Sequence, residues 1–454
     1  MSAIYIIAAP LATAFLLGLF KEQWRSAGYV LMLVTLCFMS WLAFDWLLMF
    51  AYRGAAPVDI ITAGTPSPFA INLRMALPEA ALVLIVCVTG LLSALALRDT
   101  LLRLGRRTIA VLLVAIMAYC GIILTRDAFN LFVFIELAAI ATGGLILLSN
   151  DERVLAAGFK YLVVTQVISI LLLIGIIFAY HATGSLNIDD MADASLGLLP
   201  NGAIIFFLIF IALAAELKPV PANGWALDIY ESAHPAYSAL FSAAGAAAAL
   251  YAVDKLLAVG GADWLPVATG IGIVSFVIGN LLALPQTNDR RLLGYSSVAQ
   301  TGLILVVLGQ RDVSGDLTGF IALGLLVAHA VAKAGLYWLS GLIAGRELTA
   351  WAALRGHPLM LFAFASLVCL LLGLPPFPGF YAKWELVHVL AAEGRLALLG
   401  LILFGALLEA TYLFRWFGYA IKRDKPAEGI SYEQGSILAI GATVIIGWGL
   451  GYLW

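Results

Sequence analysis

The chain has 454 residues, of which 63% are hydrophobic and 11% charged, and its formal net charge is -2. A soluble domain carries about 25% charged residues, so this composition excludes an ordinary soluble domain and predicts a protein embedded in a lipid bilayer. Apolar runs long enough to cross a hydrocarbon core of about 30 Å recur from one end of the sequence to the other.

These runs predict an all-α integral membrane protein of about fourteen spanning helices. In chain order the predicted spans are 3–20, 28–51, 77–97, 107–124, 128–148, 157–180, 202–217, 233–253, 264–284, 292–309, 316–344, 358–392, 395–420 and 434–453. The longest polar connection, His181 to Asn201, is expected to be a loop. The twelfth span is too long for one straight helix, and Pro375, Pro376 and Pro378 interrupt it.

The distribution of basic residues predicts the orientation of the chain. Most lysines and arginines of the predicted loops follow odd-numbered spans, as in the loop that holds Arg98, Arg103, Arg106 and Arg107. Because cytoplasmic loops are enriched in Lys and Arg, both termini are expected on the non-cytoplasmic side of the inner (cytoplasmic) membrane.

The cysteines indicate no metal or disulfide chemistry. All four lie inside apolar runs without paired spacing: Cys37, Cys87, Cys120 and Cys369. The sequence also contains no Gly-rich phosphate loop and no Cys or His cluster with ligand spacing. We therefore expect no metal, cofactor, nucleic acid or catalytic redox site in this chain. Any oxidoreductase activity would belong to partner subunits.

Charged residues inside the apolar runs are candidate functional residues, because a charge at the bilayer centre costs at least about 2.5 kcal/mol. Glu136 lies in NLFVFIELAAIATGGL without a basic residue one helical turn away, so it needs a partner from another helix or from hydroxyl groups. Lys218 lies in AAELKPVPANGW and is its predicted partner, beside the helix break that Pro219 and Pro221 impose. Glu216 is a secondary candidate, and a lysine at an ordinary helix end is the alternative for Lys218.

Lys333 is the clearest of these residues. It lies deep in LLVAHAVAKAGLYWLSGLI, with His329 one turn earlier on the same helical face. The pair predicts a proton relay. The alternatives are a lysine that snorkels to the interface and a histidine that only packs.

Lys383 follows a second interrupted segment, in GLPPFPGFYAKWELVHVL. Two interrupted segments, one in each half and each with a lysine, predict a pseudo-symmetric pair of broken helices in spans 7 and 12. Snorkelling at the far end of the span is the alternative for Lys383. Glu409 lies midway through LILFGALLEATYLFRWF and is a secondary candidate.

These groups could move protons together. Desolvation disfavours the charged form of a buried lysine or glutamate, whereas pairing favours it. A buried Lys–Glu pair is therefore a two-state element, and a row of such groups joined by His329 and water would carry protons along the membrane and then outward.

Four segments resemble the antiporter-like subunits shared by respiratory complex I, membrane-bound hydrogenases and Mrp-type cation/proton antiporters. They are LTRDAFNLFVFIEL (124–137), NDRRLLGYSSVAQTGLI (288–304), HAVAKAGLYWLSGLI (329–343) and LPPFPGFYAKW (374–384). The first segment is most similar to the D-type Mrp subunit and its counterpart in membrane-bound hydrogenases.

The resemblance implies fourteen helices with two inverted five-helix repeats. The implied parts are 1–106 for helices 1–3, 107–255 for helices 4–8, 264–420 for helices 9–13 and 434–454 for helix 14. It also implies a proton path that begins at Glu136 and Lys218, continues through His329 and Lys333, and leaves through Lys383.

The sequence departs from the family pattern after Lys218. Ala247 stands where the family has a bridging lysine, and the usual histidine after the first broken helix is missing. Water or His234 could bridge this gap, Glu409 could supply a charge that the eighth helix lacks, or the subunit could conduct less well than its relatives.

Three functions are consistent with these observations. The first is a proton-translocating subunit that works with other integral membrane subunits in an energy-converting complex. The second is an Mrp-type sodium/proton antiporter subunit, in which sodium is a second transported ion. The third is a structural membrane subunit that no longer conducts.

Overall fold

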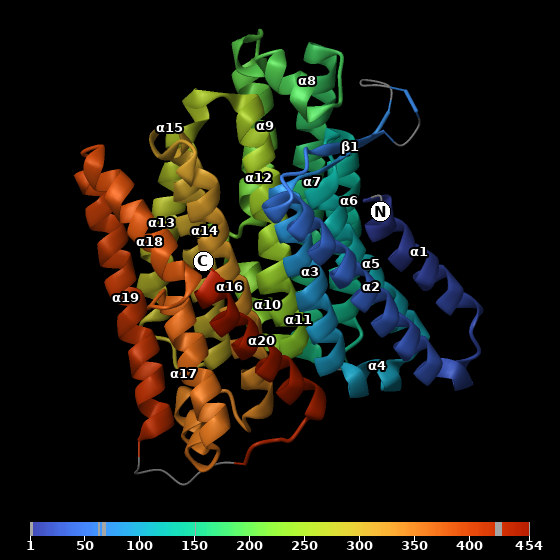
Figure 1. The fold of residues 1–454 in the computed structure, drawn as a ribbon, viewed down its shortest axis with the longest axis vertical. Helices are drawn as coiled ribbons and strands as arrows, with labels where there is room; N and C mark the ends of the chain where they lie inside the picture. The colour runs from blue at the N-terminus through green and yellow to red at the C-terminus, as the bar shows by residue number, and fades with distance from the viewer. Residues whose placement is uncertain (1–2, 62–63, 66–69, 150, 423–428, 454) are drawn as a thin grey trace. The chain divides into compact units, whose positions relative to one another are not determined.

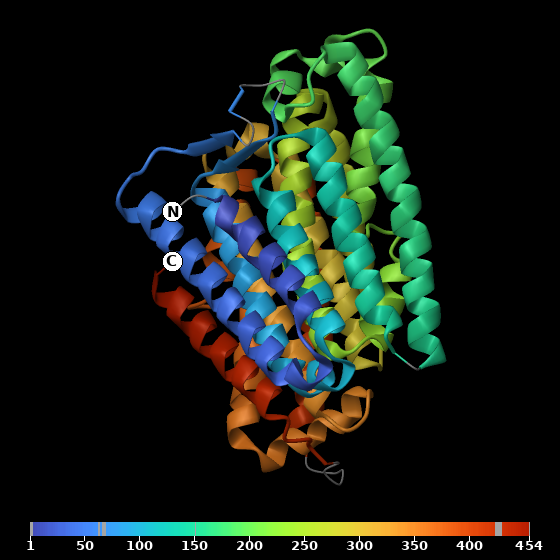
Figure 2. The same ribbon diagram turned by 90° about the vertical axis from the view of Figure 1, so that its right-hand side faces the viewer.

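The structure is a computed structural model that describes residues 3–61, 64–65, 70–149, 151–422 and 429–453. Most of these residues are helical (Figures 1 and 2). Within the described ranges, 11 helices are long and apolar enough to cross a membrane. Three shorter apolar helices are Ile4–Leu19, Gly202–Glu216 and Pro358–Leu372. The chain is therefore a multi-pass integral membrane protein, as the composition predicts.

The chain forms two compact units. The first comprises Met1–Ala94, Arg98–Leu217 and Ala244–Trp264, and the second comprises Leu95–Leu97, Lys218–Ala243 and Leu265–Trp454. The helices of the first unit are α1 (Ile4–Leu19), α2 (Arg25–Tyr52), α3 (Leu77–Ala96, whose last turn enters the second unit), α4 (Arg98–Leu104), α5 (Arg106–Leu124), α6 (Ala128–Leu147), α7 (Glu152–Thr183), α8 (Ile188–Asp193), α9 (Gly202–Glu216) and α12 (Ala246–Gly260). Those of the second unit are α10 (Gly224–Ser232), α11 (Pro235–Leu240), α13 (Leu265–Ala283), α14 (Asp289–Gly309), α15 (Arg311–Ser314), α16 (Leu317–Leu342), α17 (Pro358–Leu372), α18 (Pro378–Ala392), α19 (Leu396–Ile421) and α20 (Gln434–Leu453).

Both predicted helix interruptions are present. In the long twelfth predicted span, α17 ends at Leu372 and α18 begins at Pro378. In the seventh, α9 ends at Glu216 and the chain resumes helical structure at Gly224. Proline cannot continue a helix because it lacks the backbone donor and clashes with the preceding turn.

Two connections differ from the sequence-based expectation. The segment after α2 forms an antiparallel hairpin of β1 (Val58–Ile61) and β2 (Asn72–Met75), drawn as blue arrows in Figure 2, so the described chain is not entirely helical. The connection expected as a loop from His181 to Asn201 contains α8 instead. The side chain of Asn187 accepts hydrogen bonds from the first backbone N–H groups of α8, which explains why a polar segment turns helical there.

A buried lysine fixes the junction between α5 and α6. Lys255 on α12 is 4% exposed. Its Nζ donates to the backbone oxygens of Ile122 at 2.7 Å, Ile123 at 3.3 Å and Thr125 at 2.8 Å. The last carbonyl groups of a helix have no partner within it, so the ammonium satisfies them and meets the negative end of the α5 dipole.

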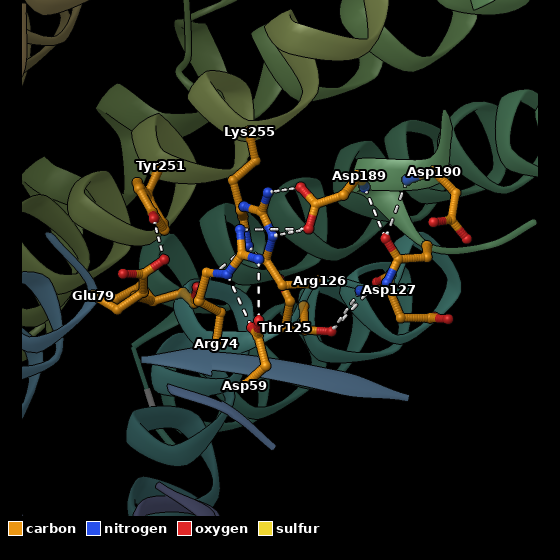
Figure 3. Close-up of polar contacts among 12 residues, drawn as sticks. Asp59, Arg74, Glu79, Thr125, Arg126, Asp127, Asp189, Asp190, Tyr251 and Lys255 are labelled. Carbon is orange, nitrogen blue, oxygen red and sulfur yellow. Dashed lines mark hydrogen bonds and ion pairs between the residues drawn. The ribbon is translucent and has the colours of Figure 1, made fainter. Parts of the chain in front are cut away.

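Charged side chains of the same unit surround this lysine (Figure 3). Arg126 forms an ion pair with Asp189, and Arg74 on β2 lies 3.4 Å from the same carboxylate. The hydroxyl group of Tyr251 donates to Glu79, which is 1% exposed. These ion pairs connect the hairpin, α8 and the α5–α6 junction.

The predicted span 233–253 placed Lys255 in the following loop, and this prediction was wrong. Helix α12 continues to Gly260 because the apolar residues after Lys255 extend its buried face. The lysine is thus a buried helical residue rather than a loop residue.

Helices α13 and α14 of the second unit pack at very short range. A Cβ atom added at Gly272 would lie 2.7 Å from the backbone oxygen of Gly302, and one added at Gly302 would lie 2.7 Å from the backbone oxygen of Gly272. Small residues let helix backbones approach closely in membranes. This packing fixes the position of α14.

We expect Lys255→Met to lower the Tm of the detergent-purified protein, because three buried carbonyl groups lose their donor. An unsatisfied buried group costs about 1–3 kcal/mol. Lys255→Arg keeps the charge and the donors and should be less destabilised. Lys21→Met, at an exposed position, is the matched control. A Tm of Lys255→Met equal to that of the control would show that the ammonium does not stabilise the junction.

We expect Gly272→Ala to separate α13 from α14, at a cost of about 1–3 kcal/mol, because its methyl group would meet backbone atoms that cannot move independently. Gly270→Ala on the same helix is the control, because nothing lies within 4 Å of its added Cβ. Thermal unfolding of the two variants makes the comparison, and equal Tm values would contradict the close packing.

Candidate functional site

The predicted charged residues occur in both units. Glu136 on α6 and Glu216 at the end of α9 belong to the first unit. The second unit contains Lys218, His234, His329, Lys333, Lys383 and Glu409. The pair predicted between Glu136 and Lys218 joins residues of different units and stays a prediction.

Glu136 is half-buried and has a neutral hydrogen-bond partner. The side-chain amide of Gln166 on α7 donates to its Oε2 atom at 2.7 Å. An amide donor orients the carboxylate and stabilises its anion without neutralising the charge. Within its own unit this carboxylate is therefore held by an amide, and not only by hydroxyl groups, which were the alternative to Lys218.

Lys218 lies directly after α9, at the predicted break. Its side chain is buried, and its Nζ lies 3.9 Å from the centroid of the Phe241 ring, a cation–π contact. Its backbone is left-handed, with φ of 59°. For a residue with a Cβ this conformation costs roughly 1–2 kcal/mol, and such strain concentrates at functional sites.

His329 on α16 has one bonded and one open ring nitrogen. Its Nε2 lies 3.1 Å from the backbone oxygen of Ser242. Because a carbonyl oxygen only accepts, Nε2 carries the hydrogen and Nδ1 has the lone pair. Among the residues that the structure describes, Nδ1 is buried and has no hydrogen-bond partner. It is therefore available to accept a proton.

Lys333 is fully buried one turn further along α16. Its Nζ donates to the backbone oxygen of Leu293 on α14 at 2.9 Å. The hydroxyl group of Ser297 donates to the same oxygen at 2.9 Å and lies 2.9 Å from the hydroxyl group of Ser242. The two residues of the predicted relay are thus joined by one chain of hydrogen bonds. It runs from Lys333 through Leu293 and Ser297 on α14 to Ser242, whose backbone oxygen binds His329.

Lys383 and Glu409 form an ion pair. The Nζ of Lys383 lies 3.2 Å from Oε2 of Glu409 and donates to the backbone oxygen of Leu372, at the end of α17, at 2.9 Å. Glu409 is fully buried, and the side-chain amide of Gln300 on α14 donates to its other oxygen at 2.5 Å. The sequence left Glu409 without an assigned partner, and the structure gives it two.

His234 and Ala247 bear on the predicted gap in the path. His234 is the N-cap residue of α11, where its Nδ1 accepts from the backbone N–H of Ala236 at 3.2 Å. Ala247 is fully buried in α12 of the first unit. The bridging role of His234 stays a prediction.

Sequence reasoning missed the neutral polar residues of this site. Ser297 and Gln300 follow Leu293 at spacings of four and seven residues, which places all three on one face of α14. That spacing was a usable signal, but an amide or hydroxyl group inside an apolar helix attracts less attention than a charge. Lys255 was missed because a span boundary was placed too early.

The described side chains offer no evident place for a metal ion. No group of three or more His, Cys, Asp and Glu residues is suitably arranged within the described ranges. What the second unit does contain is the three lysines, two histidines and one carboxylate named above, of which Lys218, His329, Lys333 and Glu409 are buried. Such groups can bind and release protons.

Three comparisons with known proteins agree on the kind of protein. The chain is 29% identical over 397 residues to NADH-quinone oxidoreductase subunit N of Desulforudis audaxviator, which covers 83% of this chain and 78% of that relative. Its fold is similar to a chain of the Mrp complex from Dietzia sp. DQ12-45-1b, with a TM-score of 0.87, 21% identity, and coverage of 99% of this chain and 95% of the other. It is also similar to a chain of the membrane-bound sulfane sulfur reductase, an archaeal respiratory membrane complex, with a TM-score of 0.83, 26% identity, and coverage of 99% and 96%.

The particular similarity to the D-type Mrp subunit is not confirmed, whereas the broader family is. Residues 125–409 match the family of NADH:quinone oxidoreductase/Mrp antiporter transmembrane proteins. This range is more than half of the chain and includes every residue of the predicted proton path. The chain therefore belongs to the NADH:quinone oxidoreductase/Mrp antiporter family of membrane proteins.

Proposed function

We propose that this chain translocates protons as one membrane subunit of a larger energy-converting complex. The observation that carries the proposal is the fully buried Lys333, one turn from a histidine with an open ring nitrogen. Membership of the family supports it, as do relatives named as subunits or parts of multi-subunit membrane complexes.

The proposed transfer step uses His329 and Lys333. An ammonium group inside the bilayer is costly when only a neutral carbonyl oxygen holds it, so Lys333 is poised to lose a proton. Once Lys333 is neutral, it can accept a proton that the open Nδ1 of His329 has taken up earlier in the path, which leaves an ammonium ion and a neutral imidazole. Because the groups interact, their protonation changes are coupled rather than independent.

The rest of the proposed path follows the sequence and the family resemblance. We propose that Glu136 and Lys218 act as a pair before this step and that protons leave through Lys383. The strained backbone of Lys218 supports a functional role for that residue. Glu216 and His234 are secondary candidates on the same path.

The proposed topology adds the number of spans, the repeats that they form and the side of the membrane on which the termini lie. We propose fourteen spans, with inverted five-helix repeats over residues 107–255 and 264–420, in the inner (cytoplasmic) membrane. Both termini are proposed to lie on the non-cytoplasmic side, since basic residues gather in alternate connections. The interruptions before α10 and α18 support the repeat relation, because each follows an apolar helix of 15 residues.

A second candidate function is sodium/proton exchange within an Mrp-type complex. The similarity of fold to a chain of the Mrp complex favours it. Purification of the native complex and identification of its subunits distinguish the two candidate functions. Hydrogenase-like or quinone-reactive partners would support the first function, whereas antiporter subunits alone, with proton movement driven by a sodium gradient, would support the second.

We expect Lys333→Met to reduce proton transport by the assembled complex at least about tenfold, because methionine fills the space but cannot carry a proton. Transport is measured in vesicles with a pH-sensitive dye, and Lys21→Met is the matched control. A structural, non-conducting subunit predicts the opposite result: an assembled Lys333→Met complex with unchanged transport.

We expect Glu136→Gln to reduce proton transport while the complex still assembles. Glutamine can still accept a hydrogen bond from Gln166, so the variant removes the charge and keeps the shape. Glu152→Gln at the exposed start of α7 serves as the control. If the purified Glu136→Gln complex transports protons at the rate of the control, Glu136 has no part in the path.

A further inference from the structure

A cationic side chain binds the corner between α13 and α14, which we call the second corner. The guanidinium group of Arg415 on α19 donates to the backbone oxygens of Leu284 and Gln286, the latter at 2.8 Å. These oxygens follow the end of α13 and lie four and two residues before Asn288, the N-cap residue of α14. The cation therefore meets the negative end of the α13 dipole.

Lys255 makes the same contacts at the corner between α5 and α6, which we call the first corner (Figure 3). Two of its three acceptors, the backbone oxygens of Ile123 and Thr125, lie four and two residues before Asp127, the N-cap residue of α6. Lys255 belongs to α12 and Arg415 to α19. Each of these helices is the last helix of its proposed repeat, and each corner follows the first helix of that repeat.

Backbone hydrogen bonds at the two corners follow the same pattern. The N-cap residue Asp127 lies opposite Asn187, and the N-cap residue Asn288 lies opposite Glu347, both in antiparallel bridges. The N–H to oxygen pairs, each at 2.8 or 2.9 Å, are Ala128 to Leu186, Ile188 to Arg126, Asp289 to Arg346 and Leu348 to Thr287. The same spacing of cation, cap and bridge indicates one arrangement that occurs twice in the chain.

Each corner sets the position of a polar group of the proposed proton path. Glu136 on α6 is the ninth residue after Asp127, and it receives a hydrogen bond from α7. Ser297 on α14 is the ninth residue after Asn288, and it donates to the backbone oxygen that binds Lys333. A helix turns by about 100° per residue, so a slip of one residue at a corner would direct either group away from its partners.

We propose that Lys255 and Arg415 are equivalent positioning residues for proton transport, which bind the corners before α6 and α14 and so fix the register of Glu136 and Ser297. An arginine does at the second corner what a lysine does at the first, so the role requires a charged N–H donor and no release of its proton. This proposal rests on the proposed proton transport and repeats, and it adds two basic residues outside the predicted path.

Hydrogen exchange of the purified complex, followed by mass spectrometry, tests the corners themselves. Lys255→Met should speed exchange of the bridge amides of Ala128 and Ile188 at least about tenfold and leave the second corner unchanged. Arg415→Met should speed exchange only at the second corner. This measurement does not depend on whether the complex moves protons. Unaltered exchange at a variant's own corner would overturn the proposed role of that cation.

Proton transport by the assembled complex in vesicles tests the positioning role. Each methionine variant should lower transport at least about tenfold, because the displaced helix no longer presents its polar group correctly. Lys255→Arg and Arg415→Lys retain the charge and the N–H donors, so they should retain at least about half of the transport. Normal transport by a methionine variant with faster exchange at its corner would contradict the positioning role. Loss of transport in both charge-retaining variants would also contradict it.

The matched controls are Lys21→Met and Arg395→Met, both at exposed positions, which should exchange and transport normally. If a methionine variant does not assemble, Lys255→Gln or Arg415→Gln replaces it with the same expected results. Lys333→Met separates this proposal from the proposed function. If Lys333→Met transports normally, the proposed function is wrong. If it abolishes transport while both corner variants transport normally, only the positioning role is wrong.

Discussion

A charged side chain among membrane-spanning helices persists only where the chain supplies polar groups to hold it. In this protein, many of these polar groups are backbone carbonyl groups. Lys255, Lys333 and Lys383 each donate to carbonyl oxygens, and two of these sites use the carbonyl groups at a helix end. A neutral oxygen binds an ammonium group without cancelling its charge, so the lysine stays buried while its proton remains removable.

The same principle distinguishes Lys255 from the lysines proposed to carry protons. Lys255 meets three carbonyl oxygens at once and lies beside an ion-paired network, which suits a fixed charge that holds a helix junction. Lys333 has one carbonyl partner and a histidine with an open nitrogen nearby. Lys383 is ion-paired with the buried carboxylate of Glu409. Lys333 therefore has fewer hydrogen-bond acceptors than Lys255 among the described residues.

Much of this could be predicted from the sequence, since hydropathy and proline position are local signals. The helices, the interruption between α17 and α18 and the burial of Lys333 followed from runs of apolar residues and from single charges within them. The hydrogen-bond and ion-pair partners of the buried charged residues could not be predicted in the same way. Gln300 and Glu409 are 109 residues apart, and no local pattern indicates that an amide on one helix will bond a carboxylate on another. The boundary error at Lys255 arose because a lysine near the end of an apolar run resembles a loop residue.

The central claim is that ionisable side chains in the membrane interior lie along a hydrated path for protons. A cryo-electron microscopy structure of the purified complex in lipid, at a resolution that shows ordered water, tests it most directly. The account predicts water at Nδ1 of His329 and along the way between Lys333 and Lys383. Dry apolar packing between these groups, with the lysines directed separately to the aqueous faces, would contradict it.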